Sequence, residues 1–147
     1  MKPYHLASLD RLRAIAAYFP VFDAPDFEFA TWTPPKERDG VVSLRGYTLS
    51  ATAQDFLRTA DDAGWVVQFD WGTWIGTDEA ARLRDDPNAL SHATPGQLAK
   101  LLTVVVRQNR FVEGELVDAF ESGLLVGILR RADALVREAE RDGFLGG

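Results

Sequence analysis

The sequence predicts a mainly α-helical single domain, a bundle of about five to six helices around a central buried helix. Helix-start signals precede segments with a helical hydrophobic period. The most apolar region, residues 100–131, carries its apolar side chains at helical spacing. With 147 residues, of which 46% are hydrophobic, the chain is long enough for one core. We therefore expect residues 1–147 to form one globular domain.

The N-terminal part is expected to contain one helix and then a loop. Ser8 can cap a helix over residues 9–19, and Pro20 would stop it. Residues 21–39 lack a helical period and include three prolines, which predicts a loop. The loop contains four large aromatic residues: Phe22, Phe27, Phe29 and Trp32. We expect these rings to pack on the core rather than to bind a ligand.

Two stretches have the pattern of extended structure. Residues 41–47 are predicted as a short extended piece or as a hairpin with its turn near Gly46. Residues 65–70 also have an extended pattern and lead into a turn.

Two shorter helices are predicted in the middle of the chain. Ser50 can cap a helix that runs to Asp62, with Gly64 as its stop. Thr77 can cap a short helix over residues 78–84. Residues 88–93 would then be a linker into the central helix.

The central helix, about residues 95–110, has the clearest start signal. Thr94 and Gln97 have capping-box spacing, and Pro95 falls at the first helical position. Its polar side chains form a stripe: Lys100, Thr103, Arg107 and Arg110. The β-branched run at residues 104–106 is also compatible with a buried strand, but the cap and the stripe favour a helix.

Gly123 allows two interpretations of the C-terminal region. It can end a helix over residues 115–122 in a left-handed conformation, so that residues 124–141 form a separate helix that Gly143 ends. Alternatively, one continuous helix would place Ala119, Gly123 and Gly127 on a single face and allow a close helix crossing. We favour two separate helices, because a new run of apolar residues begins directly after Gly123.

The chain contains the run GWVVQFDWGTW and, further on, LLTVVVRQNRFVEGELVDAFESGLLVGILRR. These runs resemble a bacterial family of unknown function, DUF6508, over about residues 53–131. The most specific part comprises Leu102-Thr103, Arg107, Arg110-Phe111, Glu113-Gly114 and Glu121-Ser122-Gly123. Because that family has no assigned activity, the resemblance implies a fold and a set of residues but no reaction.

Composition argues against several classes of function. The net charge of −6 opposes general binding to nucleic acid or anionic lipid. With no cysteine, and with His5 and His92 outside any zinc spacing, we expect no metal and no cofactor. The chain shows no signal peptide pattern and no apolar run of the roughly 20 residues that cross a bilayer. We therefore expect a cytoplasmic protein that does not enter a membrane.

The first candidate site is a group of charged residues within the apolar region. Arg107 and Arg110 lie close in sequence to Glu113 and Glu121, and Thr103 belongs to the same polar stripe. A guanidinium can hold a phosphate or carboxylate in two-point contact, which would make an anion site. Alternatively, the arginines pair with the glutamates and fix the angle between two helices. We favour this ion-pair hypothesis.

The second candidate site is the turn at residues 70–74. Asp70 and the indoles of Trp71 and Trp74 can hold a flat ligand or a cation. Alternatively, the tryptophans pack into the core and Asp70 caps nearby N–H groups, which is the more common arrangement.

No classical catalytic motif is present, so any catalytic residues are unknown. We predict a binding function, either to a protein partner or in a homo-oligomer, with residues 21–39 as the contact surface. The alternative is an enzyme or sensor that binds a small anion at Arg107 and Arg110 beside Trp71.

Overall fold

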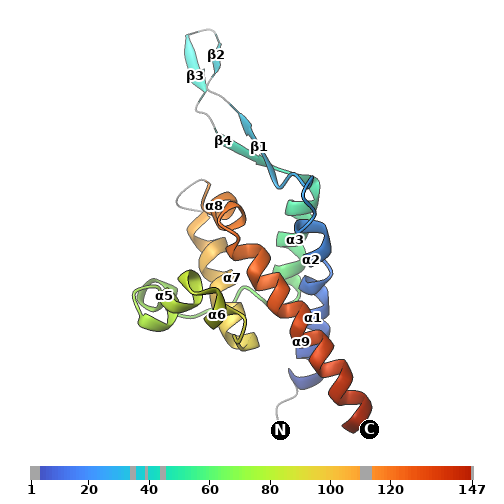
Figure 1. Ribbon diagram of the computed structural model, residues 1–147. Coiled ribbons are helices and arrows are strands. Elements are labelled where there is room, and N and C mark those ends of the chain that lie inside the picture. Colours follow the sequence, from blue (N-terminus) through green and yellow to red (C-terminus); the bar gives the residue numbers. More distant parts are fainter. Residues whose placement is uncertain (1–3, 34–35, 39, 44–45, 110–113, 147) are drawn as a thin grey trace.

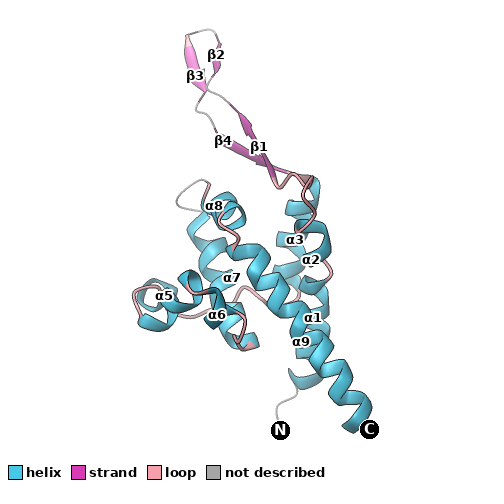
Figure 2. Ribbon diagram, viewed as in Figure 1, coloured by secondary structure: helices cyan, strands magenta, loops and turns pink. Residues whose placement is uncertain are grey.

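The computed structural model describes residues 4–33, 36–38, 40–43, 46–109 and 114–146. Helices dominate this part of the chain, which confirms the mainly α class (Figure 2). Six of the described helices have seven residues or more: α1 (Tyr4–Ala16), α3 (Ala51–Asp62), α5 (Asp78–Asp85), α7 (Pro95–Asn109), α8 (Glu115–Glu121) and α9 (Leu124–Gly146). Short helical turns form α2 (Phe19–Phe22), α4 (Trp71–Trp74) and α6 (Pro87–Leu90).

Helices α7 and α9 form the centre of the bundle. α9 packs against α1, α2, α6, α7 and α8. Figure 1 shows α1, α2 and α3 to one side of α9, and α5 and α6 to the other. The most buried side chains come from both central helices and include Leu98, Leu102, Leu125, Ile128 and Leu129. The predicted buried helix is therefore present, and α9 shares its central position.

An aromatic cluster fills the end of the core nearest the strands. Phe22 is its centre, with ring centroids 5.0 Å from Phe27, 5.5 Å from Phe29 and 5.2 Å from Phe56. Phe120 of α8 stacks on Phe29 at 4.6 Å. Phe22, Phe27 and Phe29 therefore pack on the core, as expected, whereas the side chain of Trp32 lies outside the described residues.

The strands form a projecting hairpin, which we call the arm (residues 30–49). β1 (Ala30–Thr33) pairs antiparallel with β4 (Gly46–Leu49), and β2 (Lys36–Arg38) pairs antiparallel with β3 (Val41–Ser43). The arm extends away from the helices (Figure 1). Gly40, with φ of 79°, lies between β2 and β3. The predicted loop over residues 21–39 was therefore wrong where β1 and β2 form, because strand pairing depends on a partner distant in sequence. Of the two alternatives for residues 41–47, the extended one is confirmed by β3 and β4, whereas the turn near Gly46 was wrong because Gly46 begins β4.

Two helix boundaries near prolines also differ from the prediction. Ser8 lies inside α1, which ends at Ala16, and Pro20 occupies the first turn of α2 rather than stopping a helix. Pro87 likewise opens α6 where a linker was expected, and Asp86 caps it by accepting a backbone N–H at 3.0 Å. Proline suits a first helical turn because that turn needs no N–H donor there.

The other predicted caps are present. Ser50 and Thr77 each accept the backbone N–H three residues later at 3.2 Å. Thr94 and Gln97 form the reciprocal capping box, with hydrogen bonds of 2.9 and 3.2 Å. Gly123 has φ of 88°, which confirms the break between α8 and α9.

The last helix is longer than predicted. α9 continues to Gly146, so Gly143 does not end it. A glycine inside a helix lowers its stability by roughly 1 kcal/mol relative to alanine, which the rest of a long helix can tolerate.

Candidate functional site

Thr103 is buried completely and holds a neighbouring segment by hydrogen bonds. Its hydroxyl accepts the backbone N–H of Val67 at 2.9 Å. It donates to the carbonyl oxygen of Ala99 at 2.7 Å. The carbonyl oxygen of Trp65 is a second possible acceptor, at 3.2 Å. The predicted extended segment, residues 65–70, therefore forms no strand and is tied to α7 by this side chain.

The turn at residues 70–74 forms α4, and Asp70 caps it. Asp70 accepts the Thr73 backbone N–H at 3.2 Å and the Thr73 hydroxyl at 2.7 Å. These two hydrogen bonds, the hydroxyl first, lower the pKa of the Asp70 carboxyl below its usual value. Trp71 is half-buried and Trp74 is buried. Asp70 therefore has an internal partner at the start of α4.

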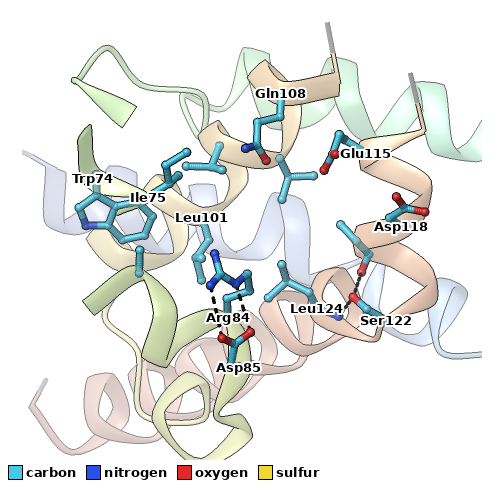
Figure 3. Close-up of a pocket in the computed structure, with 14 residues that line it drawn as sticks. Trp74, Ile75, Arg84, Asp85, Leu101, Gln108, Glu115, Asp118, Ser122 and Leu124 are labelled. Carbon is cyan, nitrogen blue, oxygen red and sulfur yellow. Dashed lines mark hydrogen bonds and ion pairs between the residues drawn. The ribbon is translucent and has the colours of Figure 1, made fainter. Parts of the chain in front are cut away.

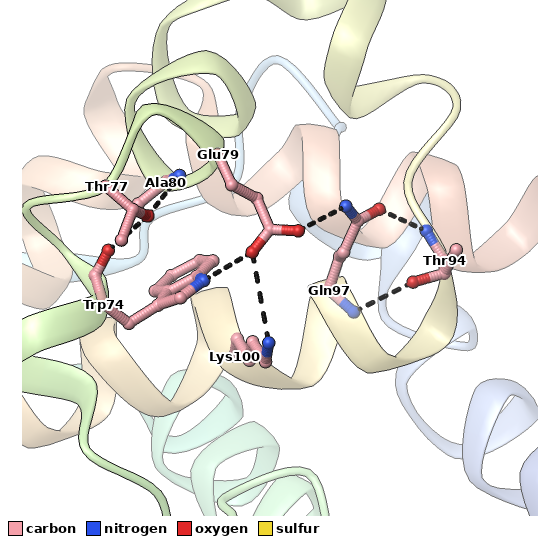
Figure 4. A network of polar contacts seen from close by, with 7 residues as sticks. All are labelled: Trp74, Thr77, Glu79, Ala80, Thr94, Gln97 and Lys100. Carbon is pink, nitrogen blue, oxygen red and sulfur yellow. Dashed lines mark hydrogen bonds and ion pairs between the residues drawn. The ribbon is translucent and has the colours of Figure 1, made fainter.

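A polar network links α4, α5 and α7 around Glu79 (Figure 4). The Trp74 indole N–H donates to Oε1 of Glu79 at 2.6 Å, and Gln97 Nε2 donates to Oε2 at 3.0 Å. The hydrogen bonds from Trp74 and Gln97, and then the nearby charge of Lys100, lower the pKa of the Glu79 carboxyl. Lys100 Nζ lies 4.0 Å from Oε1 and 5.8 Å from the centre of the Trp74 ring.

No pattern in the sequence singled out Glu79. The only local signal was its position in the first turn of a predicted helix, where an acidic side chain is common. Its partners come from two other helices, so the network appears only once α5 packs on α7.

The charged residues of the first candidate site are only partly described. Arg110 and Glu113 lie outside the described residues. Arg107 is half-buried and Glu121 is exposed. Among the ion pairs that the structure describes, none joins Arg107 to Glu121.

Two adjacent arginines of α9, Arg130 and Arg131, have partners in other parts of the fold. Arg131 donates to the carbonyl oxygen of Ala93 at 2.8 Å and lies 3.7 Å from Glu138. Arg130 lies 3.9 Å from Asp23. These arginines connect α9 to the start of α7 and to the end of α2.

A pocket of about 410 Å³ lies between α4, α5, α7, α8 and the start of α9 (Figure 3). Its lining combines apolar and polar side chains: Trp74, Ile75, Ala80, Arg84, Asp85, Leu101, Val104, Val105, Gln108, Glu115, Asp118, Ala119, Ser122 and Leu124. Of the candidate residues that the structure describes, Trp74 is the one in this lining. The pocket was not predicted, because its walls come from five elements.

The described part of the chain contains no group of three or more His, Asp or Glu side chains arranged to hold a metal ion. In the same residues, no helix combines the length and the apolar character that crossing a bilayer requires.

The chain belongs to the family of unknown function DUF6508, whose sequence model matches residues 7–138. This match starts before residue 53, so the family includes α1 and the arm as well as the helices that the resemblance covered. Neither a curated protein nor a solved structure matches the chain.

Proposed function

We propose that the chain acts by binding a protein through its arm, and that the partner is a second copy of the same chain. The observation that carries the proposal is the arm itself, which extends from the helices and consists of two successive two-stranded antiparallel sheets (Figure 1). A two-stranded ribbon is only marginally stable in water. Its outer edges offer unpaired backbone N–H and C=O groups to another strand.

The two edges of the arm differ in their ability to accept a strand. Two prolines, Pro34 and Pro35, follow β1 in the sequence, and proline has no backbone N–H to donate to an added strand. The edge formed by β3 and β4 contains no proline. At its base, Leu49 already uses its carbonyl oxygen to accept from Gln54 Nε2 at 2.9 Å. We therefore place the added strand further out, along β3 and the first half of β4.

Charge favours contact through the arm. Three basic and two acidic residues give the arm a charge of +1, which leaves −7 on the rest of a chain whose total is −6. Two helical bodies of that charge repel each other strongly, whereas two arms of +1 repel each other only weakly. Identical edges can also pair antiparallel about a twofold axis, since such an interface is self-complementary.

The proposal modifies the contact surface expected from the sequence. Phe22 and Phe29 are buried, so they are not available to a partner. The strand edge replaces them as the surface that supports binding. The alternative, a small anion bound at an Arg/Trp/carboxylate cleft, gains no support from Asp70 and Trp74, because both have internal hydrogen-bond partners.

A shortened arm tests the proposal. Thr33 and Gly46 are register partners, so an Asn-Gly turn can replace residues 34–45 and join them. In sedimentation velocity over a range of concentrations, we expect the intact chain to form dimers and the shortened chain to stay monomeric. The aromatic cluster stays intact, so both chains should have the same helical circular dichroism. Their melting temperatures should agree at concentrations where the intact chain is also monomeric.

A matched pair of proline variants locates the edge. Glu37 and Val42 are also register partners. Proline at either position should therefore weaken the β2–β3 pairing to the same extent. Val42→Pro should abolish the dimer and Glu37→Pro should weaken it much less, because Val42 alone lies on the proposed edge. An intact chain that is monomeric at high micromolar concentration, or a dimer that survives loss of the arm, would overturn the proposal.

A further inference from the structure

We propose that the pocket in Figure 3 binds a small organic cation, an ammonium group that carries a compact apolar body. This site is separate from the arm and does not depend on self-association. Three properties support the proposal: the size of the pocket, its apolar wall, and the negative charge that remains unpaired in its lining.

The size and the apolar wall suit a small ligand. Pockets that bind small molecules usually have volumes of about 300–1,000 Å³, and this pocket has about 410 Å³. Leu101, Val104 and Val105 of α7 supply a buried apolar surface. Ile75 and Leu124, both half-buried, extend it toward α4 and α9. An apolar body placed here would leave water at little cost.

The charges of the lining favour a cation. Arg84 is held by Asp85, with Nε 3.1 Å from Oδ1 and Nη2 3.3 Å from Oδ2. Within the described residues, the carboxylates of Glu115 and Asp118 have no ion pair or hydrogen bond. Among the lining residues that the structure describes, one basic and three acidic side chains therefore give a charge of −2. An anionic ligand would be repelled.

The position of the two free carboxylates supports a shared role. Glu115 and Asp118 lie three residues apart on α8 and therefore on the same face of the helix. Figure 3 shows both on one side of the pocket, with Gln108 of α7 nearby. The Gln108 side chain oxygen can accept a further N–H from an ammonium group. Both acids also interact favourably with the N-terminal end of the α8 dipole. That interaction does not depend on whether the carboxylates face a pocket, so it does not explain their position here.

The test uses hexylammonium as the probe and hexanol as its uncharged counterpart. In ¹H–¹⁵N NMR titrations, hexylammonium should produce saturable shifts at Ile75, Leu101 and Leu124. Hexanol should bind at least tenfold more weakly, a difference of about 1.4 kcal/mol. Raising the salt concentration should weaken the binding of hexylammonium only.

Matched charge variants separate the pocket from the general acidity of the protein. Glu115→Gln combined with Asp118→Asn should weaken hexylammonium binding at least tenfold. Asp61→Asn combined with Asp62→Asn removes the same charge from the exposed end of α3 and should leave binding unchanged. Glu121→Gln, on α8 but outside the lining, should also have no effect. Circular dichroism checks that each variant is folded.

Several results would overturn the proposal. These are no saturable shifts with hexylammonium, equal binding of hexanol, or equal losses in the two double variants. The chain with the shortened arm should bind hexylammonium like the intact chain, so a failure of the arm proposal would not be mistaken for a failure of this one.

Discussion

The hydroxyl of Thr103 accepts the backbone N–H of Val67 at 2.9 Å, and this bond fixes residues 65–70 against α7. Thr103 has no exposed surface and Val67 is half-buried, so water has little access to the bond. A buried donor that loses its acceptor costs about 1–3 kcal/mol. We therefore expect Thr103→Val, which keeps the shape of the side chain, to lower the free energy of unfolding by that amount in urea denaturation.

Thr103→Ser is the control for this prediction. Serine keeps the hydroxyl and loses one methyl group, so it should cost less than the valine variant. If Thr103→Val were as stable as the unchanged protein, the hydrogen bond would not hold the segment.

The Glu79 carboxyl predicts a pH dependence of stability. Its hydrogen bonds to Trp74 and Gln97 lower the pKa below the usual value of 4.5. A group with a lowered folded pKa stabilises the folded state above its unfolded pKa, and this contribution is lost as the pH falls through the folded pKa. Stability of the unchanged protein should therefore exceed that of Glu79→Gln at pH 7, and the difference should shrink below about pH 4.5.

Asp78→Asn is the matched control for Glu79→Gln. Both residues lie in the first turn of α5, so both variants lose a similar interaction with the helix end. Thermal melts from pH 3 to 7 should show the pH-dependent difference for Glu79→Gln beyond that for Asp78→Asn. Equal behaviour of the two variants would mean that the network does not stabilise the fold.

Local signals in the sequence predicted the helices well. The capping box at Thr94 and Gln97 and the left-handed stop at Gly123 each depend on a few adjacent residues, and the structure has them as predicted. β1 was missed because it is stabilised by β4, more than ten residues further on. Pro20 was taken as a helix end, but it lies in the first turn of α2, since proline is compatible with both positions.

The candidate sites were harder to predict because their partners also lie on elements that are distant in sequence. The sequence singled out Trp74, but its partner Glu79 belongs to another helix. Thr103 was placed on a polar stripe, whereas packing of residues 65–67 buries it. The pocket collects side chains from five elements, and no periodic pattern in one segment contains that information.

Gly123 and Gly72 allow a test of backbone conformation alone. A Cβ at Gly123 would meet no atom within 4 Å, but φ is 88°, which is unfavourable for alanine. Gly123→Ala should therefore lower the free energy of unfolding by about 1–2 kcal/mol. Gly72 lies in the helical turn α4, and a Cβ there meets Asp70 only at 3.9 Å. Gly72→Ala should be neutral or slightly stabilising in the same denaturation experiment.

Arg107 tests whether a buried ion pair fixes the angle between α7 and α8. Loss of one partner from a buried pair usually costs about 3–5 kcal/mol, whereas an exposed pair is worth about 0–1. Because Arg107 is half-buried and does not pair with Glu121, we expect Arg107→Met to cost about 1 kcal/mol or less in thermal and urea denaturation. Adding Glu121→Gln should give a simple sum of the two effects. A large loss that Glu121→Gln or Glu113→Gln recovers would instead identify that glutamate as the partner of Arg107.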